Sequence, residues 1–150
     1  MMLFLKMNCL GKSRGINFVD STHIKVCHNR RVHQHNVFKA VAERGFRSIG
    51  WFYGFKLHLI INDSGEILSF YLTKGNVDDR NLKVMQSLTE DILGKLFGDK
   101  SYISKALSNL LFTDGIQLVT KVKKNMKHHS LSATDKILLR KRAMHHRIRK

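Results

Sequence analysis

The 150-residue chain has few cysteines, few acids and no long apolar run, and each scarcity excludes a class of protein. Its two cysteines lack paired spacing, which excludes a disulfide framework and favours a reducing compartment such as a bacterial cytoplasm. No stretch approaches the roughly 20 apolar residues that a membrane-spanning helix needs. The apolar start, Met1 to Leu10, has no basic segment before it and no small-residue cleavage site, so it does not resemble a signal peptide. We expect it to be the start of a chain cut into mid-domain.

The shortage of acids leaves a strongly basic chain. Lys and Arg number 27 against 11 Asp and Glu, a formal net charge of +16, so a polyanion is the first expected partner. Nucleic acid is the leading candidate and an acidic membrane surface the second. A hydrophobic content of 43% supports a folded protein, and the length suggests one domain.

A strand is predicted over Ile16 to Val26, where apolar and polar residues alternate. Asp20 falls on the same face as Phe18 and Ile24, because side chains two apart share a face of a strand. A carboxylate in that position needs hydrogen bonds, a cation or a metal ion to offset its desolvation. The alternative is an acid at a strand end that faces water or caps a turn.

The segment from Cys27 to Gly50 is predicted to be a basic insertion between strands. Val37 to Arg44 can form one or two helical turns that end at Gly45. Four side chains suggest zinc, but their spacing lacks a second paired motif, which favours solvated, phosphate-facing side chains. These four are Cys27, His28, His33 and His35.

A hairpin is predicted from Trp51 to Thr73, with its turn at Asn62 to Gly65. Lys56 and His58 share one face of its first strand, opposite the apolar side chains of that strand. Such a face can border a polyanion, and the alternative is an edge or a half-exposed face. The opposite face carries Phe55, Leu57, Leu59 and Ile61.

Two helices are expected next, separated by a short strand. Asp78 and Asp79 are interpreted as caps at the start of the first helix, which ends at Gly94. The strand ends at Gly98, so Asp99 lies at its carboxyl end, where ligands gather in open α/β sheets. Capping of the following helix is the alternative role for Asp99. The expected buried stripes are Leu82, Met85, Leu88 and Ile92, then Ile103, Ala106, Leu107, Leu110 and Leu111.

The C-terminal part combines a strand, Ile116 to Val122, with a basic helix from about Thr134 that is capped by Thr134 or Ser132. From Lys121 to Lys150 there are eleven Lys or Arg residues and one acid, Asp135. The last residues, A-M-H-H-R-I-R-K, have no apolar period and are predicted to form a tail.

These elements follow the order βββαβαβα, which predicts an α/β fold with a five-stranded mixed sheet and helices on both faces. The first and fourth strands then lie side by side in parallel, and Asp20 approaches Asp99. Two carboxylates in a basic groove repel one another unless a divalent cation lies between them, and Mg²⁺ prefers such oxygen ligands.

Five motifs, in this order, resemble the catalytic domain of a DDE-class transposase from a bacterial insertion sequence, which has a ribonuclease-H-like fold. They are V-D-S-T at Val19 to Thr22, Y-G-F-K-L-H-L at Tyr53 to Leu59, T-K-G-N-V-D-D at Thr73 to Asp79, G-D-K-S-Y at Gly98 to Tyr102 and K-V-K-K-N-M-K at Lys121 to Lys127.

The resemblance implies an enzyme of DNA transposition that cleaves and transfers DNA strands by two-metal-ion phosphoryl transfer, with Mg²⁺ or Mn²⁺ held by two Asp and one Glu. By this analogy Asp20 and Asp99 are catalytic residues and metal ligands. The implied partners are insertion-sequence ends and target DNA, with homo-oligomers or association with intact transposase possible. The expected DNA-binding residues are Lys25, Arg30, Arg31, Lys39, Arg44, Lys56, His58, Lys100, Lys121, Lys123, Lys124, Lys127, Arg140, Lys141 and Arg142.

The chain departs from the family pattern at three places. Ser101 replaces a glycine, almost nothing precedes Ile16, and no Glu follows Asp135 where the third acid is expected, shortly after Arg142. We therefore expect an N-terminal remnant (1–15), a partial transposase domain (16–142) and a basic tail (143–150), inactive because it is truncated. The alternatives are a non-catalytic DNA-binding fragment and a small basic nucleic-acid-binding protein; an RNA-binding protein explains the charge but not the two strand-terminal aspartates.

Overall fold

The computed structural model describes residues 10–121 and 131–147, with side chains described as far as residue 142. Within these ranges the strands are β1 (Ile16–Cys27), β2 (Glu43–Arg47), β3 (Gly50–Asn62), β4 (Ile67–Lys74), β5 (Gly94–Gly98) and β6 (Ile116–Thr120). The α-helices are α2 (Leu82–Thr89), α3 (Lys105–Thr113) and α4 (Ala133–Arg147). Two 3-10 helices, η1 (Asn29–Gln34) and η2 (Lys100–Tyr102), complete the described elements.

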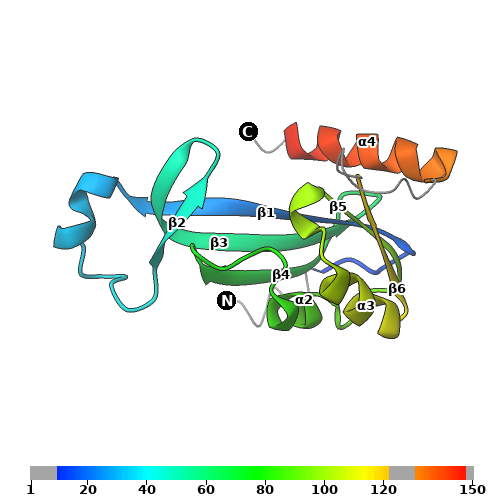
Figure 1. Ribbon diagram of the computed structural model, residues 1–150, viewed down its shortest axis with the longest axis horizontal. Helices are drawn as coiled ribbons and strands as arrows, with labels where there is room; N and C mark the ends of the chain where they lie inside the picture. The colour runs from blue at the N-terminus through cyan, green and yellow to red at the C-terminus, as the bar shows by residue number, and fades with distance from the viewer. Residues whose placement is uncertain (1–9, 122–130, 148–150) are drawn as a thin grey trace.

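One mixed sheet organises the fold. Its path is β2-β3-β1-β5-β6, and β4 pairs with β3 beside β2 (Figure 1). β1 runs antiparallel to β3 but parallel to β5, and β5 runs parallel to β6. The predicted α/β fold is therefore confirmed: the expected first and fourth strands, β1 and β5, are parallel neighbours. The short strand β2 is an addition to the expected five strands.

The helices cover both faces of the sheet, as predicted (Figure 1). On one face, α2 and α3 pack Met85, Leu88, Leu107 and Leu111 against strand residues such as Ile60. On the other face, α4 packs Leu138 and Leu139 against Phe18, Phe97 and Val119. Burial of these apolar side chains supplies the main stabilisation of both layers.

Of the one or two helical turns predicted for Val37 to Arg44, one forms: the Ala42 amide donates to the Phe38 carbonyl at 2.8 Å, and strand β2 follows from Glu43 instead of a second turn. The chain forms η1 earlier, at Asn29–Gln34, and then enters β2, which pairs with the start of β3 so that Phe46 lies opposite Trp51. Strand pairing outweighs the weak helical preference of this segment, as tertiary context commonly does.

The predicted helix start at Asp78 and Asp79 is also wrong. The helix α2 begins at Leu82, and its N-cap is Asn81, whose side-chain oxygen accepts a hydrogen bond from the Val84 amide at 3.2 Å. Both aspartates are therefore available for contacts outside the helix.

The last helix extends further than its expected ordered part. Ser132, one of the two predicted caps, caps this helix: its hydroxyl accepts a hydrogen bond from the Asp135 amide. The helical backbone continues to Arg147, into the segment expected to be a tail, because no glycine or proline interrupts it. The domain boundaries at 15, 142 and 143 stay a prediction. Among the described residues, no helix is long and apolar enough to cross a membrane.

Candidate active site

Asp20 and Asp99 come together where the parallel pairing of β1 with β5 stops. Asp99 follows the end of β5, whereas Asp20 lies inside β1, which continues along β3 to Cys27. Phe18 of β1 is in register with Phe97 of β5, and each acid lies two residues further along the chain. Because side chains two apart share a face, both carboxylates lie on the side of the sheet that α4 covers. The Phe18 and Phe97 rings, with centroids 5.6 Å apart, form the apolar floor beneath them.

A local turn fixes the Asp99 carboxylate at the start of η2. Its Oδ1 accepts a hydrogen bond from the Ser101 amide at 2.7 Å and another from the Ser101 hydroxyl. Ser101, where the family pattern has glycine, thus has a direct partner in the site. Capping and catalysis were alternatives for Asp99 in the sequence, but a cap uses one carboxylate oxygen and leaves the other to face Arg142.

Arg142 of α4 joins the two acids. Its Nη2 lies 3.1 Å from Oδ1 of Asp20 and 3.9 Å from Oδ2 of Asp99. Its Nε donates to the Val19 carbonyl at 3.3 Å, beyond the point where β1 stops pairing with β5. One guanidinium therefore occupies the place between the carboxylates where a divalent cation is expected.

The donor set fits a hard divalent ion. The Asp20 and Asp99 side chains are 25% and 46% exposed, so solvent reaches both. Two carboxylates that face one cation, with water and phosphate completing the shell, suit Mg²⁺ or Mn²⁺. In the described part of the chain, no three His, Cys, Asp or Glu side chains gather closely enough to form a complete protein-ligand site.

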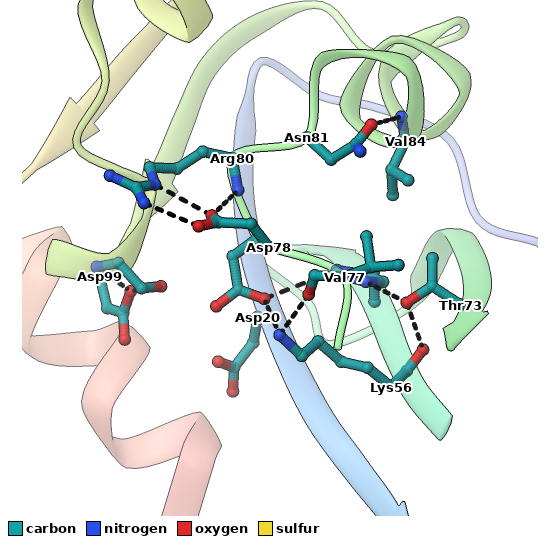
Figure 2. Close-up of polar contacts among 12 residues, drawn as sticks. Asp20, Lys56, Thr73, Val77, Asp78, Arg80, Asn81, Val84 and Asp99 are labelled. Atoms are coloured by element: carbon teal, nitrogen blue, oxygen red, sulfur yellow. Dashed lines mark hydrogen bonds and ion pairs between the residues drawn. The ribbon is translucent and has the colours of Figure 1, made fainter. Parts of the chain in front are cut away.

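A second charged cluster lies on the opposite face, at β3 and the loop before α2. Lys56 Nζ lies 3.3 Å from Oδ1 of Asp79. It also donates to the Val77 carbonyl at 2.7 Å (Figure 2). The same carboxylate oxygen lies 3.9 Å from Nδ1 of His58. Sequence reasoning missed the contact of Asp79 with Lys56 and His58, because a helix start explained the Asp78–Asp79 pair on its own.

Burial keeps His58 neutral. Its side chain has no exposed surface, and Nε2 lies 3.0 Å from the Thr73 hydroxyl, which itself donates to the Lys56 carbonyl. Desolvation lowers the His58 pKa to about 4; Asp79 opposes the shift and Lys56 adds to it. Because the Thr73 proton is directed to a carbonyl, we assign the His58 proton to Nε2.

Tyr102 lies between the two clusters. It is almost fully buried, and its pKa is raised well above the usual value, first by burial and then by the charges of Asp79 and Asp20. The charges of Asp79, Asp20 and Asp99, which come from three different parts of the chain, therefore all act on the Tyr102 hydroxyl.

Of the twelve expected DNA-binding residues that the structure describes, eight are exposed, two (Lys141 and Arg142) are half-buried and two are buried. Lys56 and His58 lie on the buried face of β3, which does not fit their expected contact with a polyanion. Lys141 is half-buried and donates to the Asp63 carbonyl. Three expected residues, Lys123, Lys124 and Lys127, lie outside the described residues. The exposed ones are Lys25, Arg30, Arg31, Lys39, Arg44, Lys100, Lys121 and Arg140.

Asp135, the acid of the last helix, pairs with Lys95 and not with the site formed by Asp20 and Asp99. The Asp135 carboxylate accepts hydrogen bonds from Lys95 Nζ at 2.8 and 3.1 Å, and these bonds lower the Asp135 pKa. Lys95 lies near the start of β5, whereas Asp99 follows its end. Asp135 therefore anchors α4 and does not complete the acidic pair.

Comparison with known proteins places the chain in a family. A family profile described as "Transposase DDE domain" matches residues 10–150. Among solved structures, the chain is similar to a piggyBac transposase in a synaptic complex with hairpin DNA, with a TM-score of 0.53 and 12% identity. The match covers 79% of this chain and 25% of that one, so the chain spans about a quarter of its length. No curated protein matches the sequence.

Proposed function

The chain belongs to the transposase DDE domain family, and from this premise we propose that Asp20 and Asp99 hold a divalent cation, Mg²⁺ or Mn²⁺, against a DNA phosphate. The proposal also assigns the chain to a bacterial insertion sequence, whose ends and target DNA are its partners in a bacterial cytoplasm. Self-association or association with an intact transposase belongs to the same proposal.

One observation carries the proposal: the Asp20 and Asp99 carboxylates share a single cationic nitrogen, Nη2 of Arg142. Two carboxylates held close together on a rigid framework repel each other unless a cation lies between them. Here Arg142 of α4 supplies that cation. When bound there, a divalent ion activates a water or a 3′-hydroxyl and stabilises the leaving oxygen at phosphorus. Asp20 and Asp99 orient the ion, while Lys100 and Lys121 lie next to the ends of β5 and β6 and attract the phosphate backbone.

We further propose that this chain binds DNA but cleaves it poorly or not at all. Within the described residues, α4 presents Arg142 to the acidic pair, and no third carboxylate joins it. A non-catalytic DNA-binding fragment that competes with an intact transposase is the function that this arrangement favours next.

Calorimetric titration with Mn²⁺ tests the metal site. The unsubstituted chain is expected to bind weakly, and the double variant Asp20→Asn with Asp99→Asn is expected to lose binding. The matched control is Asp114→Asn, which removes an exposed acid at the end of α3. Equal Mn²⁺ affinity in the double variant and the unsubstituted chain would refute the site.

A gel-shift series over increasing salt tests the DNA interface, and a strand-nicking assay tests catalysis. We expect binding that weakens steeply with salt, because phosphate contacts release counterions. We expect no nicking above background in Mg²⁺ or Mn²⁺. Nicking abolished by Asp99→Asn would show an active enzyme, and salt-independent binding would contradict the phosphate interface.

A further inference from the structure

The β2–β3 hairpin exposes two aromatic side chains that the proposed function leaves unexplained. Phe46 and Trp51 are paired across the strands and are 65% and 63% exposed. Their rings meet edge to face with centroids 5.3 Å apart. Large aromatic rings on a surface of a basic protein are a common platform for nucleobases, since every base has a π face.

Each ring of the aromatic pair lines a different cavity. Phe46 lines a cavity of about 440 Å³ together with Lys56, Arg80, Lys100 and Ser101. Trp51 lines a second cavity, of about 460 Å³, together with Asn29 and Arg44. Each ring therefore faces a space with at least one cationic side chain in its wall.

The first cavity adjoins the loop that follows Asp99, one of the two proposed metal ligands. Ser101, which lines it, donates both its amide and its hydroxyl to Asp99. Lys100, also in its wall, follows Asp99 directly. Phe46 and the two residues that follow Asp99 thus border one cavity, and Trp51 packs against Phe46 from the neighbouring cavity.

The charges in the wall favour an anion. The Arg80 guanidinium pairs with Asp78 through two contacts of 2.9 and 2.7 Å, which lowers the Asp78 pKa to about 2 (Figure 2). Lys56 and Asp79 pair with each other. These pairs cancel, and Lys100 has no acidic partner among the described residues, so its charge remains for a ligand.

The hairpin is held in place without a ligand. The Asn29 side chain donates to the Trp51 carbonyl at 2.7 Å. Gly45, behind Phe46, packs so closely on Gly75 that a Cβ there would overlap the Gly75 carbonyl. Little ordering of the backbone is therefore needed on binding, which favours affinity.

We propose that this cavity receives one unpaired nucleotide of a DNA strand, with its base against Phe46, whose ring packs on Trp51, and its phosphate towards Lys100. The inference rests on the proposed function, because it takes the strand at Asp99 to be DNA. It adds a preference for unpaired DNA next to the reacting phosphate, which a stacked duplex base cannot satisfy without leaving its stack.

Intrinsic fluorescence tests the inference directly, because Trp51 is the single tryptophan of the chain. The full chain is titrated with a short oligothymidylate, with an abasic strand of the same length and with a blunt duplex. We expect quenching by the oligothymidylate and protection of Trp51 from acrylamide. The abasic strand carries the same phosphates without bases and is expected to bind with little change in fluorescence.

Variants separate stacking from charge. Phe46→Ala, and Trp51→Leu followed with a labelled oligothymidylate, are expected to weaken binding by roughly 5- to 100-fold, the range of one lost base–aromatic stack. Phe112→Ala is the matched control, because Phe112 is 78% exposed on α3, away from the hairpin. Circular dichroism and thermal melting confirm that each variant is folded.

The outcomes distinguish the two proposals. If no form of DNA binds in a salt-dependent manner, the proposed function fails. If DNA binds but Phe46→Ala and Phe112→Ala have equal affinity, or the abasic strand quenches Trp51 as strongly as oligothymidylate, only the stacking inference fails. Stronger quenching by the duplex than by the single strand overturns the preference for an unpaired nucleotide.

Discussion

Two groups of charged side chains lie beside the middle of β1, on opposite faces of the sheet, and they differ in how their charges are matched. On the α4 face, Asp20 and Asp99 share the single guanidinium of Arg142. On the other face, Asp79 pairs with Lys56 beside the fully buried His58. We call these the open cluster and the closed cluster.

Exposure and charge together separate the two clusters by role. The closed cluster has one cation for one acid, both at most 16% exposed, and Lys56 also donates to the Val77 carbonyl. The open cluster has two acids for one cation, and its acids are 25% and 46% exposed. A matched, buried pair stabilises the fold around it, whereas an unmatched, accessible pair is suited to bind a cation from solvent.

The largest effect is expected from breaking the closed cluster. Asp79→Ala leaves the Lys56 ammonium buried without its acid, which costs about 3 kcal/mol in the free energy of unfolding. Asp20→Ala in the open cluster is expected to cost less than about 1 kcal/mol, since that pair is partly solvated. Urea denaturation of both variants measures the difference.

A charge-neutral double variant controls this prediction. Lys56→Met with Asp79→Leu removes both charges and is expected to regain most of the stability that Asp79→Ala loses. Equal unfolding free energies for Asp79→Ala and Asp20→Ala would show that the two clusters do not differ in the way proposed.

The next effect is a pH dependence of the closed cluster. The unfolded chain takes up a proton at His58 near its ordinary pKa of 6.5, whereas the folded chain does so only near pH 4. Protonation therefore favours unfolding, and stability that is complete above pH 6.5 falls by up to about 3 kcal/mol as the pH drops to 4. Thermal melting against pH measures this loss.

The matched variant is His58→Gln, which keeps a donor for the Thr73 hydroxyl but does not titrate. Its melting temperature is expected to change less between pH 6.5 and 4 than that of the unsubstituted chain. Burial lowers the His23 pKa as well, so part of the pH dependence remains in the variant. Parallel curves for the two proteins would exclude His58 as the titrating group.

The open cluster could be predicted from the sequence because strand order and alternation determine it. Once β1 and β5 are parallel neighbours, an acid two residues beyond each paired phenylalanine must reach the same edge and face. The closed cluster could not be predicted in this way. It depends on which face of β3 is buried, and a lysine and a histidine do not signal burial in one sequence.

Long-range partners account for the other errors. Asp78 and Asp79 are interpreted from the sequence as helix caps. Asn81, the actual cap, is an equally good candidate and follows Asp78 by three residues, so the local pattern does not distinguish them. The pairing of β2 with β3 depends on a contact between Gly45 and Gly75, which no local pattern reveals. Arg142 was expected to contact DNA, and its place between Asp20 and Asp99 follows only from how α4 packs.

A smaller effect is expected when the cation of the open cluster is removed. Arg142→Gln abolishes a pair worth about 1 kcal/mol, so Mn²⁺ no longer competes with it and binds roughly fivefold more tightly. Calorimetric titration measures the affinity. Arg140→Gln, which removes an exposed arginine from the same helix, is the control. Equal affinities in the two variants would exclude Arg142 as a competitor for the metal site.

The smallest effect concerns DNA. Lys100 adjoins the open cluster and is exposed, so Lys100→Gln is expected to reduce the slope of log affinity against log salt by about 1, with a modest loss of affinity. The double variant Lys56→Met with Asp79→Leu is expected to keep the slope unchanged, because Lys56 already pairs with Asp79 and the net charge does not alter. Fluorescence anisotropy over a salt series measures both slopes. An equal reduction in the two proteins would mean that the closed cluster opens when DNA binds, and the division between the clusters would then apply only to the free chain.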